Sequence, residues 1–93
     1  LLIMATTSST TVDFGAGATD ATAFVSATGV SSGSMVEAWI VPADTATNKA
    51  DNHWFDSLAV MAGNVVPGSG FTIYAKCTEG LAHGTFNIGW VHT

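Results

Sequence analysis

Positive charge is nearly absent from this sequence. Arginine does not occur, and the only basic side chains apart from histidine are Lys49 and Lys76. A protein that binds nucleic acid by neutralising its phosphates needs a basic patch, so this class is excluded. The same shortage excludes a protein that binds membrane surfaces through polybasic segments. We therefore expect neither nucleic acid nor a membrane among the partners of this chain.

Charge of either sign is also scarce. Charged residues make up 10% of the chain, against about 25% in ordinary soluble domains. Alanine, glycine, serine and threonine supply nearly half of the sequence, so most of the surface must be small and neutral. A free monomer normally stays soluble because of its surface charge. The composition therefore favours a chain whose surface is largely covered by copies of itself or by other proteins.

Disulfides and membrane spans are two further structural devices that the sequence lacks. Cys77 is the only cysteine, which excludes an intramolecular disulfide and a zinc site built from several thiolates. The longest clean apolar run, Leu58–Gly63, is far shorter than the roughly 20 residues of a membrane-spanning helix. The apolar start, Leu1–Met4, has no preceding basic residues, as a secretory signal would. Met4 resembles a natural start, which leaves open whether Leu1–Ile3 are native.

The dominant sequence period is two, which is typical of half-buried β-strands. Segments that contain glycine and proline separate the alternating runs, as turns require. Three strands are expected from clear alternation and three from weaker alternation: Ser34–Val41, Gly70–Cys77 and Thr85–His92, then Thr10–Phe14, Ala21–Thr28 and Ser57–Val66. We therefore predict an all-β fold, a small antiparallel β-sandwich that is jelly-roll-like. It is expected to span residues 10–93 as one domain, after an N-terminal arm over residues 1–9.

One polar stretch, Ala43–Asn52, interrupts the alternation. Asp51 is a residue type that caps helices, so we expect at most one short helix, near residues 51–57. Trp54 and Leu58 lie four positions apart, which would let one helical turn place an apolar side on the sheet.

The alternation also sorts the aromatic side chains. Strand parity separates Trp39 from the apolar face formed by Val36 and Ile40, whereas Trp90 is expected in the core. A domain of this size buries only about 60% of its extended surface, so association would add stability. Aromatic residues are enriched at subunit interfaces. We predict a subunit interface that includes Trp39, Met35, Trp54 and Tyr74.

No constellation of catalytic residues emerges from the sequence. His53, His83 and His92 are of a type that binds zinc, but they lack local ligand spacing, and loop or strand-end positions explain them better. His53, Ser57 and either Asp56 or Asp51 are the residue types of a catalytic triad, but they lie in one segment too short to reach its geometry. We therefore predict no enzyme activity, no catalytic residue, no cofactor and no metal.

The strands and turns follow one another in a recognisable order, carried by the motifs Thr11–Ala16, Val36–Ile40, Ala50–His53, Ala62–Ala75 and Gly84–Val91. In this order they resemble the small β-rich structural proteins encoded among the virion genes of tailed bacteriophages. The resemblance covers nearly the whole chain from about Thr10. It implies a non-enzymatic building block of a phage particle, located in the virion after assembly in the host cytoplasm.

Three functions are compatible with this resemblance. We expect first a tail-fibre or tail-appendage subunit that assembles as a homotrimer and contacts other virion proteins. A capsid decoration (cement) protein is the first alternative. A host-glycan-binding module is the second, because exposed Trp54 and Tyr74 would stack on the sugar rings of a host surface glycan. The resemblance leaves open whether the chain lies in a tail fibre, at the tail tip or on the capsid.

Overall fold

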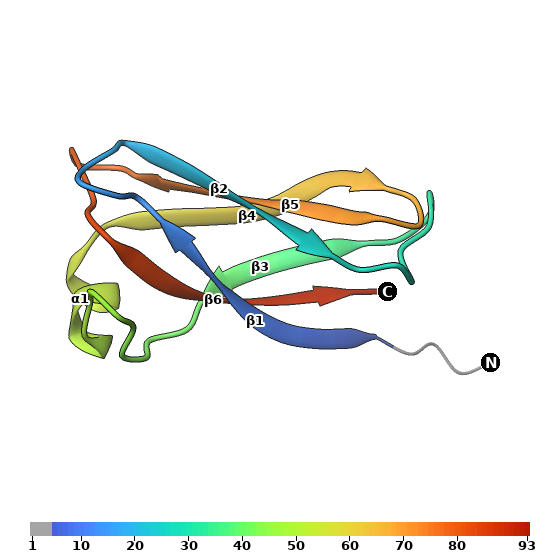
Figure 1. Cartoon of the computed structure of the whole chain (residues 1–93), viewed down its shortest axis with the longest axis horizontal. Helices are drawn as coiled ribbons and strands as arrows, with labels where there is room; N and C mark the ends of the chain where they lie inside the picture. The colour runs from blue at the N-terminus through green and yellow to red at the C-terminus, as the bar shows by residue number, and fades with distance from the viewer. Residues whose placement is uncertain (1–4) are drawn as a thin grey trace.

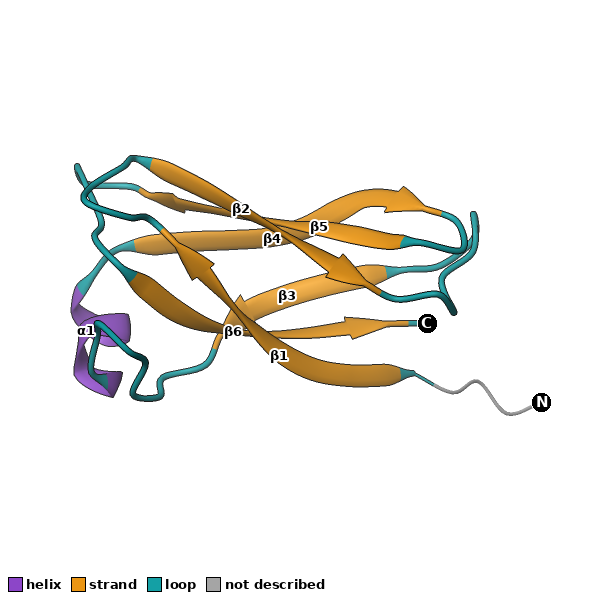
Figure 2. Ribbon diagram, in the orientation of Figure 1, coloured by secondary structure: helices purple, strands orange, loops and turns teal. Residues whose placement is uncertain are grey.

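The computed structural model describes residues 5–93, which form two three-stranded antiparallel sheets and one short helix (Figure 1). The helix lies at one end of the molecule, and no helix among the described residues is long and apolar enough to cross a membrane (Figure 2). The predicted small all-β fold is therefore confirmed. The elements in chain order are β1 (Thr6–Asp13), β2 (Asp20–Ser26), β3 (Val36–Ile40), α1 (Ala50–Phe55), β4 (Leu58–Val66), β5 (Gly70–Cys77) and β6 (Thr85–His92).

The chain crosses between the two sheets at almost every connection. One sheet has the strand order β1-β6-β3, and the other has the order β2-β5-β4. The β4–β5 hairpin is the one connection between described strands that stays within a sheet. Because β1 pairs with β6 and β2 pairs with β5, the pairing is nested. This winding resembles that of a jelly roll, with six strands in place of eight.

Strand β1 begins earlier than the sequence predicts. Residues 1–9 are expected to form an arm, but Thr6 to Ser9 pair residue by residue with His92 to Gly89 of β6. Most of β1 is exposed on both faces, so threonine and serine occupy positions where alternation would otherwise be visible. Threonine is β-branched and favours extended backbone. The predicted arm is therefore wrong for residues 6–9, and residues 1–4 lie outside the described residues.

The hydrophobic core lies between the two sheets and is built from the inward side chains of both. Its largest fully buried members are Phe71, Phe86, Ile73, Ile88 and Val12. The Phe71 ring meets the Trp90 ring edge-on, with centroids 5.4 Å apart. Trp90 is buried, as predicted, and Val36 and Ile40 pack against the core on the side of β3 opposite Trp39. Cys77 is half-buried at the edge of this core.

Helix α1 differs from the prediction at its start and on its buried side. Lys49, not Asp51, precedes the helix, and its backbone N–H donates to the Asn52 side-chain oxygen at 2.8 Å. His53 turns inward and is 5% exposed, whereas Trp54 is 82% exposed. The expected contact of Trp54 with the sheet is therefore wrong. A helix of six residues has fewer than two turns, so the inward position of His53 directs its neighbour outward.

Candidate interaction surface

His53 joins the helix to the sheet. Its Nε2 accepts a hydrogen bond from the Asn87 backbone N–H at 2.8 Å. Nε2 must then be the unprotonated nitrogen of a neutral ring, which leaves Nδ1 to donate to the Lys49 carbonyl at 3.1 Å. Because the backbone engages both ring nitrogens, neither is left to activate Ser57. The ring also packs edge-on against Phe86, with centroids 5.0 Å apart.

The other two histidines lie apart from His53. His92, although next to last in the chain, ends β6 as a buried residue and stacks on Trp90, with ring centroids 5.8 Å apart. His83 is exposed in the β5–β6 loop, beside Gly17. Within residues 5–93, no three His, Cys, Asp or Glu side chains gather as a metal site would require. His83 lies in a loop and His92 at a strand end, as predicted, whereas His53 lies in the helix. The two buried histidines, His53 and His92, support the fold.

The four residues predicted for a subunit interface are all exposed, but they do not lie on one surface. Tyr74 is on the outer face of the β2-β5-β4 sheet, and Trp39 is on the outer face of the β1-β6-β3 sheet. Met35 lies just before β3, where its backbone N–H donates to the Thr93 side chain at 2.9 Å. Trp54 is on α1, beyond the ends of the sheets (Figure 1). One flat contact therefore does not include all four residues.

The outer face of the β2-β5-β4 sheet gathers large apolar side chains. The register places Tyr74 between Thr22 of β2 and Met61 of β4 in one row across the strands. Phe24 follows in the next row, opposite Thr72. Phe24 is 55%, Met61 65% and Tyr74 38% exposed. We call this surface the β5 face and define it by Asp20, Thr22, Phe24, Met61, Val66, Tyr74 and Lys76.

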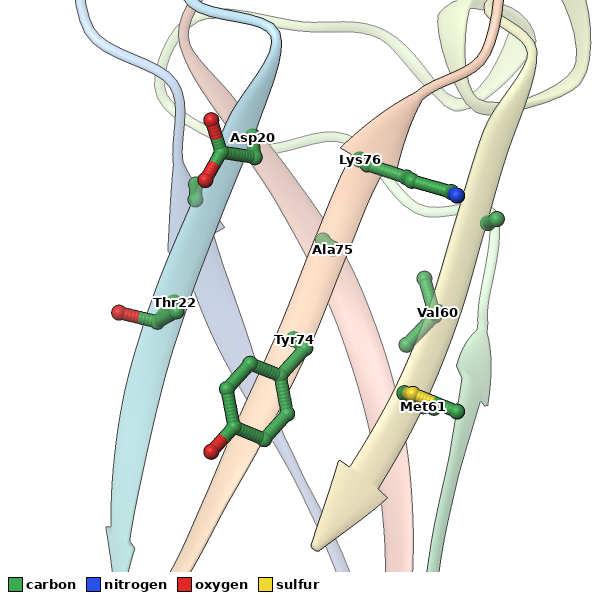
Figure 3. A pocket seen from close by; sticks show the side chains of 9 residues that line it. Asp20, Thr22, Val60, Met61, Tyr74, Ala75 and Lys76 are labelled. Atoms are coloured by element: carbon green, nitrogen blue, oxygen red, sulfur yellow. The ribbon is translucent and has the colours of Figure 1, made fainter.

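A hollow of about 320 Å³ lies at one end of the β5 face. In Figure 3, Tyr74 projects from β5 beside it, Asp20 projects from β2, and Lys76 extends from β5 toward β4. The lining is mainly apolar, with polar atoms supplied by Asp20, Thr22 and Lys76. The hollow therefore offers an apolar floor with one carboxylate and one ammonium group near it.

The β5 face carries no net charge. Asp20 and Lys76 are its two ionic residues, and they are partners across β2 and β5. Lys49 forms an exposed ion pair with Asp44 at 3.9 Å, outside this face. The remaining acidic residues lie outside the residues that define this face, on β1, β3 and α1 and in two loops: Asp13, Glu37, Asp51, Asp56 and Glu79. The formal net charge of −5 is therefore concentrated away from the β5 face.

The outer face of the β1-β6-β3 sheet is called the β6 face below, and its one aromatic side chain, Trp39, rests on a glycine of the same face. Trp39 lies across its partner Gly89, where an added β-carbon would come within 2.9 Å of Trp39 Cε2. The absence of a side chain on Gly89 lets the indole rest on the strand, which leaves Trp39 41% exposed. The other outward residues of the β6 face are small or polar for the most part: Ser9, Thr11, Glu37, Asn87 and Val91.

Sequence reasoning finds Tyr74 but misses Phe24 and Met61 beside it. Phe24 lies in a strand with weak alternation, where its exposure is not evident. Met61 lies within the apolar run Leu58–Gly63, in which outward and inward positions look alike. The pairing of β2 and β4 with β5 is the missing information, since it joins residues far apart in the chain.

Known proteins offer no further guide to this surface. Comparison of the chain with family models, with curated proteins and with solved structures gave no match. The surfaces of the molecule and the order of its motifs therefore carry the functional assignment.

Proposed function

We propose that this chain is a non-enzymatic building block of a tailed-phage virion, which works by associating with copies of itself and with other virion proteins. A tail-fibre or tail-appendage subunit is the first choice, and a capsid decoration protein is the second. The strand and turn motifs that resemble such proteins support the phage assignment. The surfaces described above support association as the mode of action.

The exposed β5 face is the observation that carries the proposal. Soluble monomers rarely expose a contiguous apolar patch unless it binds something. Here Phe24, Tyr74 and Met61 are neighbours on adjacent strands, and each is exposed to solvent. The chain also has few charges to keep a monomer dispersed. Covering this face with another protein would remove apolar surface from water, which favours association by about 25 cal/mol per Å².

Two of the three histidines, His53 and His92, are engaged within the fold, which supports a role without catalysis. General-base or nucleophilic catalysis needs a side chain with a free nitrogen or oxygen directed at a substrate. Both nitrogens of His53 bond to backbone groups, and His92 is buried against Trp90. The hollow on the β5 face holds neither residue in its lining.

The phage assignment is tested on particles. Virions are purified from a host that produces them from the genome encoding this chain, and an antibody against the chain is applied in electron microscopy with gold labelling. We expect label at a fixed place on every particle, on the tail for the first choice or on the capsid for the second. Particles that contain no copy of the chain by mass spectrometry would contradict the proposal.

A host-glycan-binding module is a candidate of a different class, because of the groups beside Tyr74. The hollow combines an aromatic ring with Asp20, Thr22 and Lys76, which are hydrogen-bonding groups that suit sugar hydroxyls. Trp54 does not line the hollow, so the predicted pair of stacking rings reduces to Tyr74. Binding of host polysaccharide that Tyr74→Ala abolishes would support this candidate, and wild-type protein that binds no host polysaccharide would contradict it.

A further inference from the structure

The β5 face has a hollow at one end and the exposed Phe24 ring at the other. The hollow lies beside Tyr74 and Lys76, where β2 begins. The Phe24 ring is 55% exposed and lies at the opposite end over Gly70, where an added β-carbon would lie 2.9 Å from Phe24 Cζ. The stretch of β5 from Ala75 to Gly70 separates the two features by about 17 Å.

Large and small side chains alternate between the two central rows of this face. On β5, the large Tyr74 is followed in the next row by the smaller Thr72. On β2 the order is reversed, because Thr22 shares the row of Tyr74 and Phe24 shares the row of Thr72. A rotation that exchanges the two rows would therefore place each large side chain opposite a small one.

We propose that two copies of the chain pack their β5 faces together around a twofold axis that runs across the strands, with the Phe24 ring of each copy in the hollow of the other. This rotation exchanges the two ends of the face, so the ring and the hollow meet twice, as in the isologous contact of a dimer. The hollow has about 320 Å³, which exceeds the cavity of about 150 Å³ known to hold a benzene ring.

The proposal rests on the self-association proposed above and names its contact. A twofold contact builds assemblies from pairs of chains, in place of the homotrimer predicted from the sequence. It also places the predicted interface residue Tyr74 inside the contact and leaves Trp39 outside it, because Trp39 belongs to the other sheet.

The distribution of charge favours a second copy as the occupant. Asp20 and Lys76 cancel within each face, so two such faces approach without net repulsion. The proposed rotation keeps the Lys76 side chains of the two copies about 20 Å apart along the strands. That separation exceeds the screening length of about 10 Å at 0.1 M salt. A partner of strong charge would find no opposite net charge on this face.

Two variants of the full chain test the contact, one at the ring and one at the hollow. Phe24→Ala removes the ring, and Thr22→Trp fills the hollow that the ring would enter. Both positions are exposed, so the fold is expected to persist, which circular dichroism checks. Sedimentation equilibrium is expected to show a dimer of wild-type chains and a dissociation constant raised about thirtyfold in each variant, as for a strong interface residue.

Mixing the two variants gives the sharper test. In the mixed pair, Phe24 of the Thr22→Trp chain meets the open hollow of the Phe24→Ala chain, and the new Trp side chain faces the new Ala. Native mass spectrometry is therefore expected to show the heterodimer in preference to both homodimers. Trp39→Ala is the matched control, an aromatic side chain removed from the outer face of the other sheet, and it should leave the dimer unchanged.

These measurements distinguish failure of the twofold contact from failure of self-association. A wild-type chain that stays monomeric at every concentration would overturn both. A wild-type oligomer that neither variant weakens would overturn the twofold contact alone and leave self-association standing. A heterodimer no more abundant than the homodimers, or a wild-type trimer, would also overturn the twofold contact.

Discussion

The two outer faces of this sandwich are built from the same alternating strands and differ in how they treat an aromatic side chain. On the β6 face, Trp39 lies on Gly89 and covers it. On the β5 face, Phe24 also lies over a glycine, Gly70, but is 55% exposed, and Tyr74 faces solvent beside a hollow at the other end. The β6 face also carries Glu37, whereas the β5 face has no net charge. Each face therefore has one ring that rests on a glycine, but the β5 face adds the exposed side chains of Tyr74 and Met61 and a hollow.

This difference shows why strand parity alone does not identify an interface. Parity places Trp39 and Tyr74 alike on outward positions. Whether an outward ring is available depends on the residue beneath it, and that residue belongs to a neighbouring strand. Gly89 is opposite Trp39 in β6, far from it in the sequence. Which outward ring has large apolar neighbours on adjacent strands becomes clear only when the pairing of strands is known.

The largest effect is expected from Gly70→Ala, because Gly70 packs closely against the Val25 backbone and beneath the Phe24 ring of the β5 face. Gly70 has φ +154°, and an added β-carbon would overlap the Val25 carbonyl oxygen and press on the Phe24 ring. Since a backbone atom cannot yield as a side chain can, the variant should lose about 3 kcal/mol or more of stability. Urea unfolding at one protein concentration measures this loss. Gly33→Ala is the control, because Gly33 has no such contact, and an equally small effect of both would refute the argument.

The next effect compares the two faces in association. Phe24→Ala should weaken the oligomer by about 2 kcal/mol, and Trp39→Ala should weaken it much less. The reason is that Phe24 is the more exposed ring, at 55% against 41% for Trp39, and that it lies in the proposed contact on the β5 face. Sedimentation equilibrium of both variants at matched concentrations checks the difference. A larger effect of Trp39→Ala would mean that the interface lies on the β6 face, around the Trp39 side chain that the sequence predicted for it.

One glycine substitution on each outer face compares the two faces by the change in the free energy of unfolding. Gly89→Ala should cost about 1–2 kcal/mol, because the new methyl group displaces the Trp39 ring, which must lift from the strand. Gly63→Ala, on the β5 face, meets nothing within 4 Å and should be neutral or stabilise by about 0.5–1 kcal/mol. Tryptophan fluorescence should shift to longer wavelength only in Gly89→Ala. Equal effects of the two variants would mean that Trp39 does not rest on Gly89.

The smallest effect is expected from Trp54→Ala, which lies on neither face. Trp54 is 82% exposed on α1, so its loss should change stability by less than about 0.5 kcal/mol and leave association unchanged. Thermal unfolding and sedimentation provide the two readouts. Dissociation of the oligomer by this substitution would bring the helix into the interface.

Much of the fold could be predicted from local pattern. Strands β5 and β6 begin and end at the predicted residues, because each alternates inward apolar side chains with outward smaller or polar ones over most of its length. The start of β1 could not be predicted, since Thr6–Thr11 contains only threonine and serine and has no alternation to detect. The buried side of α1 was also beyond prediction, because the bond from Asn87 to His53 spans two distant segments.

The candidate surface was less predictable than the fold. Tyr74 could be identified by type and parity, but its neighbours Phe24 and Met61 join it only through the pairing of three strands. The hollow depends on the small side chain of Ala59 lying beside Lys76 across the β4–β5 pair. Such cross-strand combinations are set by register, which no single segment of the sequence contains.

Self-association of the unmodified chain is the claim on which this account depends, and its mass in solution tests it most directly. Sedimentation equilibrium of the full chain should be recorded over a dilution series that begins at micromolar concentration. We expect an apparent mass of twice 9.5 kDa, or of a multiple of that dimer mass, and we expect it to fall toward 9.5 kDa on dilution. A single species of 9.5 kDa across the whole series would contradict the account.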